Sequence, residues 1–275
     1  MCSGIWSITI KMSKNIIYQY WDGDLRPGVE ASVKNIAEYA ERIGVEHRFE
    51  HNPAYFKNRI KGNEWKYYGA FRPVYDTDFD EYDKVLFLDC DIFAVDGLEE
   101  NIFDQLTGDI ALCTEPFQPK QRVITKGQIT SAWDNAWAKL LKESWNVNIP
   151  RTEDGLVKVW NSGVVLYSKV GRQRAREYWT DFNNYIDVMK SNNLLHFYAL
   201  DQNYLTAMIF YANMSLQELD NDWNCYIHFT HDVINPNKRL CDWRTPTSKF
   251  VHTQGAGLDQ HDAETLYRVV NRPVE

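Results

Sequence analysis

The chain has 275 residues, with 30 lysines and arginines against 38 aspartates and glutamates, so its formal net charge is −8. This length fits one large domain or two small ones, and 44% hydrophobic with 25% charged residues excludes disordered and fibrous classes. The acidic balance argues against a nucleic-acid partner. No run approaches the roughly 20 apolar residues of a membrane span, and Ile5 to Ile10 is too short for a secretory signal, which predicts a cytoplasmic protein.

The first part of the chain alternates strand and helix patterns. Met1 to Lys11 lacks periodicity, so we expect a disordered extension over residues 1–11 and a single domain over 12–275. Ile16 to Tyr20 has the composition of a strand. After a turn, apolar residues recur at helical spacing from Val29 to Ile43, and Gly44 stands where a glycine commonly ends a helix. A second strand is predicted over Val45 to Phe49.

The pattern continues with two strands that we expect to be buried on both faces, Val85 to Leu88 and Asp109 to Cys113, and a short helix between them at Leu98 to Phe103. Such alternation predicts an α/β fold with a mostly parallel central sheet flanked by helices. In this architecture ligands bind beyond the carboxyl ends of the strands.

The later part is more mixed. Helices are predicted over Trp133 to Trp145, Arg172 to Met189 and Gln202 to Tyr211, and a strand over Val159 to Tyr167 that Asn161-Ser162-Gly163 would break. Trp133, Trp137 and Trp145 lie near helical spacing, which fits either an acceptor-binding lid or core packing. No repeat or linker divides the chain, which favours one domain.

Two carboxylates follow the strand Val85 to Leu88, in the order Asp89-Cys90-Asp91. Alternate side chains of an extended segment share a face, so the two carboxylates converge if the extension continues past the strand. Hard oxygen ligands at a strand end suit Mn²⁺ or Mg²⁺, which in turn bridges a diphosphate. The alternative is a pair of solvated aspartates at a strand-to-loop junction.

Three further segments carry polar groups at positions of interest. His252 ends a short apolar run and precedes Gly255 and Gly257, where backbone can approach a phosphate; it is either a third metal ligand or a surface histidine. The polar triplet 161–163 interrupts an apolar run and needs partners, either sugar hydroxyls or a neighbouring turn. Asp201-Gln202 opens a helical segment, where it is either functional or an N-cap.

The order of these segments resembles that of the GT-A glycosyltransferases, and most closely glycosyltransferase family 8, over roughly Ile16 to Gly257. The resemblance implies the GT-A fold, a nucleotide-sugar donor, which we expect to be UDP-linked, a glycan or other hydroxyl acceptor, and Mn²⁺ or Mg²⁺ held by Asp89, Asp91 and His252. It implies that Asp201 and Gln202 are catalytic and lie beside the anomeric carbon. The donor-binding set that it implies is Tyr18, Gln19, Tyr20, Arg72, Asp89, Cys90, Asn161, Ser162 and Gly255.

The sequence departs from the family at one point. Members usually carry a lysine after the late histidine and glycine, where it grips the diphosphate, whereas this chain has Leu258-Asp259-Gln260. Arg72 or another basic residue is then left to neutralise the leaving group.

The resemblance predicts transfer with retention of the anomeric configuration. An inverting enzyme would instead need a carboxylate base, for which Glu115 and Asp154 are the candidates. A sugar-1-phosphate nucleotidyltransferase is a further alternative, although the segment 18–23 lacks the glycine-rich loop that such enzymes use. A non-catalytic carbohydrate-binding protein would account for the 10 tryptophans and 16 tyrosines. The sequence does not indicate an oligomeric state.

Overall fold

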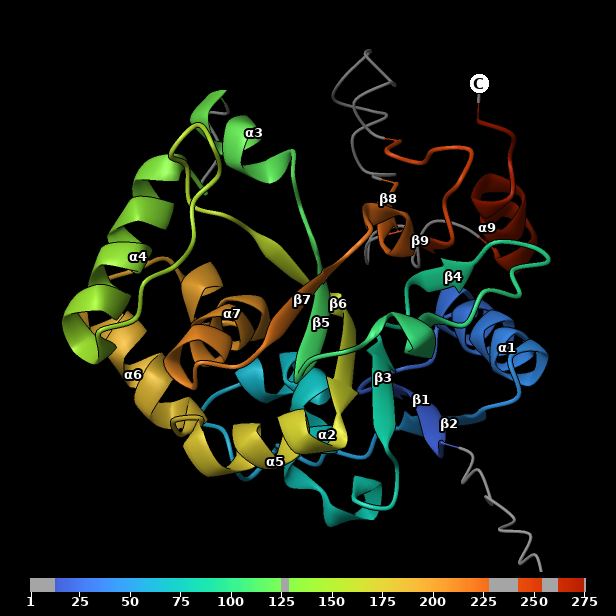
Figure 1. The fold of residues 1–275 in the computed structure, drawn as a ribbon, viewed down its shortest axis with the longest axis horizontal. Helices are drawn as coiled ribbons and strands as arrows, with labels where there is room; N and C mark the ends of the chain where they lie inside the picture. Colours follow the sequence, from blue (N-terminus) through green and yellow to red (C-terminus); the bar gives the residue numbers. More distant parts are fainter. Residues whose placement is uncertain (1–12, 125–128, 228–241, 254–261, 275) are drawn as a thin grey trace, which may run out of the picture.

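A computed structural model describes residues 13–124, 129–227, 242–253 and 262–274 (Figure 1). The expected extension over residues 1–11, together with Gly255, Gly257 and the segment 258–260, lies outside the described residues. Among the helices of the described ranges, none combines the length and the apolar character needed to cross a bilayer.

The centre of the molecule is a six-stranded sheet with the strand order β2-β1-β3-β6-β5-β7 (Figure 1). Strands β1, β2 and β3 are mutually parallel, as are β5 and β7, and β6 runs antiparallel to both of its neighbours. The predicted α/β class with a mostly parallel sheet is therefore confirmed. The strands are β1 (Asn15–Trp21), β2 (Glu46–His51), β3 (Lys84–Leu88), β5 (Ile110–Thr114), β6 (Trp160–Ser168) and β7 (Leu216–Leu219).

The opening β1-α1-β2 unit agrees with the sequence pattern. Helix α1 (Pro27–Arg42) begins with a proline, whose missing N–H is not needed in the first turn. Gly44 follows the helix with a φ of 69°, a left-handed conformation that glycine adopts without the penalty a side chain would add.

A second sheet of three short strands lies beyond the end of β3. It has the order β4-β9-β8 and consists of β4 (Ile92–Ala94), β8 (Cys225–Tyr226) and β9 (Phe250–His252). Strand β9 pairs antiparallel with β4, so that Ile92 is the partner of His252. The pairing joins segments 160 residues apart. It places His252 beside Ile92, the residue that follows the Asp89-Cys90-Asp91 turn.

Two predicted helices differ from those observed. The stretch 172–189 forms two helices, because the chain is extended at Trp179 and Asp181 then caps the second helix with its carboxylate. The segment 98–103 forms a 3₁₀ helix only from Ile102 to Gln105, capped by Asn101. The α-helices after α1 are α2 (Arg72–Tyr75), α3 (Gln118–Ile124), α4 (Ser131–Trp145), α5 (Lys169–Tyr178), α6 (Phe182–Ser191), α7 (Asp201–Tyr211) and α9 (Ala263–Val270).

Alternate residues of the central strands enter two separate cores. Tyr18 and Phe87 belong to a large cluster that includes side chains of α4, α6 and α7, whereas Ile17 and Leu88 belong to a smaller cluster that includes side chains of α1. Figure 1 shows α4, α6 and α7 on one side of the molecule and α1 on the other. Trp137 is 3% exposed within the large cluster, which supports core packing for that residue. The central strands are thus buried on both faces, as in other sheets of this class.

Candidate functional site

Asp89, Asp91 and His252 form a cluster at the carboxyl end of β3. Each offers one ligand atom, and these atoms all lie within 4.8 Å of one another. The chain does not stay extended here, because a turn follows Leu88 and the Ile92 N–H approaches the Asp89 carbonyl at 3.3 Å. The expectation that extension aligns the two carboxylates is therefore wrong, and a turn brings them together instead.

His252 is held with one ring nitrogen facing the aspartates. Its Nε2 lies 3.2 Å from Asp91 Oδ1, and its Nδ1 lies 3.1 Å from Asn224 Oδ1. The orientation of Asn224 follows from its neighbours: the Gly163 N–H donates to Asn161 Oδ1, so Asn161 Oδ1 accepts from Asn224 Nδ2. The atom that Asn224 turns to the ring is then an oxygen, which requires the proton on Nδ1. In the neutral ring, Nε2 then carries the lone pair that a metal ion needs.

Asp91 presents a buried oxygen without a hydrogen bond. Its Oδ1 has no hydrogen-bond partner within the described ranges, although the residue is only 8% exposed. Thr253 fixes the backbone at this point by donating from its N–H and its hydroxyl to the Asp91 carbonyl, at 2.9 and 3.0 Å. Buried carboxylate oxygens normally have partners. Two carboxylates and an imidazole nitrogen are ligands that suit Mn²⁺, so the residues present fit a divalent ion.

The electrostatics of the cluster agree with this assignment. Burial, and then the neighbouring charge of Asp91, raise the pKa of Asp89 to about 7. Burial alone would lower the pKa of His252, but the negative charges of Asp91 and Asp89 outweigh burial and raise it. The cluster therefore favours additional positive charge, which a proton or a cation can supply.

Gly163 lies against this cluster. A Cβ at that position would be 2.8 Å from His252 Cε1 and 2.9 Å from both Asp89 Oδ2 and Asn161 Oδ1, distances that real side chains do not tolerate. The glycine is therefore required because the backbone of β6 approaches the cluster closely. The Asp89 N–H also donates to the Gly163 carbonyl at 2.9 Å, which joins the two strands at this point.

The polar triplet does not break its strand. Residues 161–163 lie inside the continuous strand β6, so the predicted interruption is wrong. Their side chains are nevertheless buried and paired: Asn161 Nδ2 donates to Glu115 Oε1 at 3.0 Å and to Gln202 Oε1 at 3.3 Å, and the Ser162 hydroxyl donates to Asp201 Oδ2 at 2.7 Å. The structure thus brings the triplet together with the Asp201-Gln202 pair, although 40 residues separate them.

Two carboxyl groups in this network have raised pKa values. Burial raises the pKa of Asp201 to about 6, and the hydrogen bond from Ser162 opposes that shift. Burial also raises the pKa of Glu115, which the charge of Arg122 partly opposes. Glu115 is 4% exposed and lies next to Asn161, whereas Asp154, the other candidate base, is exposed and paired with Lys120 at 3.0 Å.

The predicted donor-binding residues of β1 are already paired with protein groups. The Tyr18 hydroxyl donates to Glu50 at 2.9 Å, and Gln19 Nε2 donates to the Asp89 carbonyl at 3.3 Å. The Tyr20 hydroxyl donates to Asp22, and the Cys90 thiol donates to the Tyr20 carbonyl at 3.3 Å. These contacts connect the end of β1 to the Asp89-Cys90-Asp91 turn.

Arg72 lies among acidic side chains. It pairs with Glu50 and, at 3.0 Å, with Asp76, and it approaches the Tyr18 hydroxyl at 3.4 Å. Two carboxylates therefore already balance the charge of the arginine that the sequence offers for the diphosphate.

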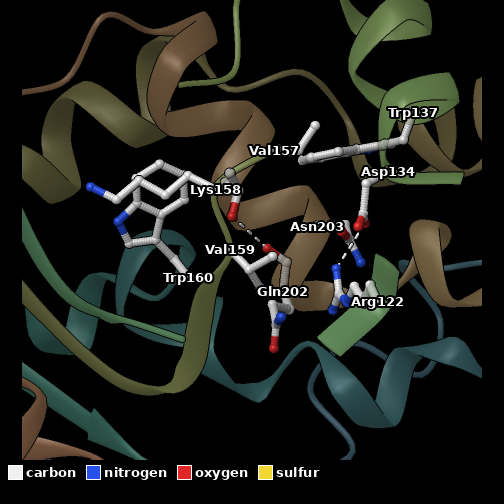
Figure 2. Close-up of a pocket in the computed structure, with 10 residues that line it drawn as sticks. Arg122, Asp134, Trp137, Val157, Lys158, Val159, Trp160, Gln202 and Asn203 are labelled. Carbon is white, nitrogen blue, oxygen red and sulfur yellow. Dashed lines mark hydrogen bonds and ion pairs between the residues drawn. The ribbon is translucent and has the colours of Figure 1, made fainter. Parts of the chain in front are cut away.

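A separate pocket of about 230 Å³, including the space open to its surroundings, borders the site through Gln202 (Figure 2). Its lining includes the ion pair between Arg122 and Asp134, whose atoms lie 2.7 Å apart, and it contains none of the three cluster residues. Figure 2 shows the Gln202 side chain pointing away from Trp137.

Asn224 was not predicted from the sequence. It lies two residues before Tyr226, is 2% exposed, and connects His252 to Asn161. The signal available in the sequence is weak, namely one amide between the buried residues Trp223 and Cys225. Its role follows only from the three-dimensional contacts.

Comparison with known proteins identifies the fold. No protein-family model and no curated protein matches the chain. Among solved structures, it is similar to galactosyltransferase LgtC in complex with donor and acceptor sugar analogs, with a TM-score of 0.51 and 15% identity over 94% of this chain and 97% of that one. An active-site mutant of LgtC, in which glutamate replaces a glutamine, matches with a TM-score of 0.50 and 14% identity over the same shares. The chain has the fold of the GT-A glycosyltransferases, as its motif order predicted.

Proposed function

We propose that the protein is a divalent-metal-dependent glycosyltransferase that moves a sugar from a UDP-linked donor to a hydroxyl of a glycan or glycoconjugate, with retention. The observation that carries the proposal is the joining of two groups of residues. The cluster of Asp89, Asp91 and His252 is connected through Asn224 and Asn161 to Gln202. The three candidate ligands and the polar residues are thus held in one hydrogen-bonded network at the carboxyl end of β3.

Asp89, Asp91 and His252 Nε2 would hold the ion, and Mn²⁺ or Mg²⁺ suits these ligands. When bound, the ion supplies Lewis-acid stabilisation of the leaving diphosphate. Asn224 holds the His252 ring so that Nε2 faces the aspartates. Gly163 lets the strand that carries Asn161 lie against the same cluster.

Asp201 and Gln202 would act on the sugar. The bond between the anomeric carbon and the diphosphate oxygen breaks, the acceptor oxygen bonds to that carbon, and the acceptor proton passes to the departing diphosphate. Positive charge develops on the sugar, where the oxygens of Asp201 and Gln202 stabilise it. Ser162 and Asn161 fix these oxygens by hydrogen bonds. An active-site glutamine of LgtC, the protein named in the second structural match, supports this role for Gln202.

Inverting transfer is a second candidate, because Glu115 lies in the same network and burial raises its pKa. As a base, Glu115 would take the acceptor proton during the attack. The anomeric configuration of the first product, observed by proton NMR, separates the two reactions. Retention supports the proposal, and inversion assigns the base role to Glu115.

The test measures release of UDP from UDP-galactose, UDP-glucose and UDP-xylose by the full chain, with Mn²⁺ or with a chelator. We expect release to require the metal, and the Asp91→Asn variant to lose about a thousandfold in rate, because it removes one charged ligand. Asp154→Asn is the matched control, since Asp154 is exposed and, within the described residues, forms an ion pair with Lys120 alone.

Metal-independent release, or equal rates for the two variants, would contradict the metal site. Formation of a nucleotide sugar from a sugar 1-phosphate and UTP would instead indicate a nucleotidyltransferase. Binding of donor without any release or transfer would indicate a carbohydrate-binding protein.

A further inference from the structure

Three aromatic rings lead from His252 to the surface. Tyr226 stacks on the His252 ring with centroids 5.2 Å apart, Phe117 meets Tyr226 edge-on at 5.5 Å, and Trp243 stacks on Phe117 at 4.4 Å with an interplanar angle of 14°. Tyr226 is 2% exposed, Phe117 is half-buried and Trp243 is 39% exposed. The series therefore begins in the candidate metal site and ends in an aromatic ring open to solvent. We call Phe117 and Trp243 the aromatic platform.

The platform is held in place by its flanking residues. The Trp243 N–H donates to the Tyr226 carbonyl at 2.9 Å, and Asp242 forms an antiparallel bridge with Ile227. Arg244, whose side chain is 2% exposed, pairs with Asp242 at 2.8 Å and donates to the carbonyls of Val269 and Val270. Trp243 is thus placed before any ligand arrives, which lowers the entropy cost of binding.

Phe117 comes from the other side of the site. It lies just after β5, where the Glu115 N–H donates to the Val159 carbonyl at 2.8 Å and the Gln118 N–H donates to the Glu115 carbonyl at 3.1 Å. The platform therefore joins the segment after β5 to the segment after β8. Both segments also carry residues of the candidate site, namely Glu115 and Asn224.

We propose that the aromatic platform binds a pyranose ring of the acceptor, so that an acceptor with a flat apolar sugar face is selected. This inference rests on the proposed function, which it extends to the class of acceptor. A large aromatic side chain with one exposed face loses little conformational freedom when a ligand covers that face. The C–H face of a pyranose is apolar enough to pack against it. The partly exposed Trp243 supplies that face, and Phe117 and Tyr226 connect it to His252.

The position of the platform favours a sugar over the base of the donor. The residues expected to hold the base lie on β1, and β3 and β6 separate β1 from β5 in the sheet. Three strand steps of about 4.8 Å place β1 and β5 roughly 14 Å apart. A base bound at β1 would therefore not cover a ring that stacks on Phe117.

The test measures KM for lactose and for maltose as acceptor probes, together with acceptor-free donor hydrolysis. We expect Trp243→Ala to raise KM for the better probe about tenfold, which corresponds to the loss of one aromatic contact. Donor hydrolysis and the donor KM stay unchanged, and Trp243→Phe restores most of the acceptor affinity. Tyr211→Ala is the matched control, because Tyr211 is 41% exposed at the far end of α7.

A Trp243→Ala variant with the same acceptor KM as Tyr211→Ala would overturn the inference, as would binding of neither disaccharide. Weaker UDP binding in Trp243→Ala with unchanged disaccharide affinity would overturn it too, because the ring would then contact the base. If no transfer occurs at all, calorimetric titration with each disaccharide decides separately. Binding that Trp243→Ala loses supports the platform even where the proposed function fails.

Discussion

Two buried carboxylates in this protein have opposite surroundings. Asp134, which is 3% exposed, accepts from Arg122 at 2.7 Å and from the Tyr198 hydroxyl at 2.8 Å. Asp91, which is 8% exposed, has an Oδ1 without a hydrogen bond in the described part of the chain, and the nitrogen that lies near it is His252 Nε2, at 3.2 Å. The protein itself compensates the first charge, whereas the second has the His252 ring nitrogen at 3.2 Å and a further carboxylate, Asp89, beside it. A compensated carboxylate stabilises the fold, and an uncompensated one is suited to bind a cation.

The largest effect expected from this comparison is on stability. Asp134→Asn leaves the Arg122 guanidinium buried without its charge partner, so the free energy of unfolding should fall by about 3 kcal/mol. Urea unfolding of the metal-free protein measures this change. The rise in melting temperature caused by Mn²⁺ should persist in the variant, because Asp134 is not among the three candidate ligands.

Asp91→Asn should have the opposite pattern, with little loss of stability and complete loss of the response to Mn²⁺. Its metal-free unfolding free energy should fall by less than about 1 kcal/mol, because relief of the repulsion with Asp89 offsets the lost contact with His252. The Mn²⁺-induced rise in melting temperature should disappear. If both variants lost the same stability and kept the same metal response, the contrast between the two carboxylates would have no functional meaning.

Asn224 tests whether the residue that orients His252 matters for metal binding at the proposed site. In Asn224→Ala the acceptor for the His252 Nδ1 proton is lost, so the ring can turn or change tautomer. We expect Mn²⁺ affinity to fall about tenfold, measured by calorimetry. Asn224→Asp keeps an oxygen facing the ring and should retain more of the affinity. A variant that folds normally and binds Mn²⁺ as the wild type does would remove Asn224 from the site.

The smallest effect concerns pH. Binding of a metal ion at the proposed site would require ionised Asp89, whose pKa is raised to about 7, so Mn²⁺ affinity should fall by at most about tenfold per pH unit below pH 7. The Mn²⁺-induced rise in melting temperature should therefore be larger at pH 7.5 than at pH 5.5. Equal rises at the two values would contradict this role of Asp89.

The raised pKa of Asp89 also sets the direction in which the stability of the metal-free protein changes with pH. Folded Asp89 binds its proton more tightly than the unfolded chain does, so this contribution to stability is present near pH 4 and is lost as the pH rises towards 7. Asp201, with a pKa raised to about 6, acts in the same direction over a narrower range. Without metal, the two groups thus favour the folded state at lower pH.

Much of the fold could be predicted because local patterns control it. The apolar run of β3, the spacing of α1 and the glycine that ends it correspond to the observed elements within a few residues. The continuous strand β6 could not be predicted, because Asn161 and Ser162 are unfavourable in an apolar strand until Glu115, Gln202 and Asp201 provide partners. The break between α5 and α6 was not predicted either, because the helical spacing of apolar residues continues through it.

By itself the sequence determined the alternating strands and helices, the acidic pair after β3 and the Asp201-Gln202 pair at the start of a helix. Local spacing and side-chain chemistry are sufficient for these features. The resemblance to a known family had also joined His252 to the acidic pair. Only the tertiary structure decided that Asn224 orients His252 and that a turn aligns the two carboxylates. The pairing of β4 with β9 brings together residues 160 positions apart, and no local periodicity specifies a contact over that separation.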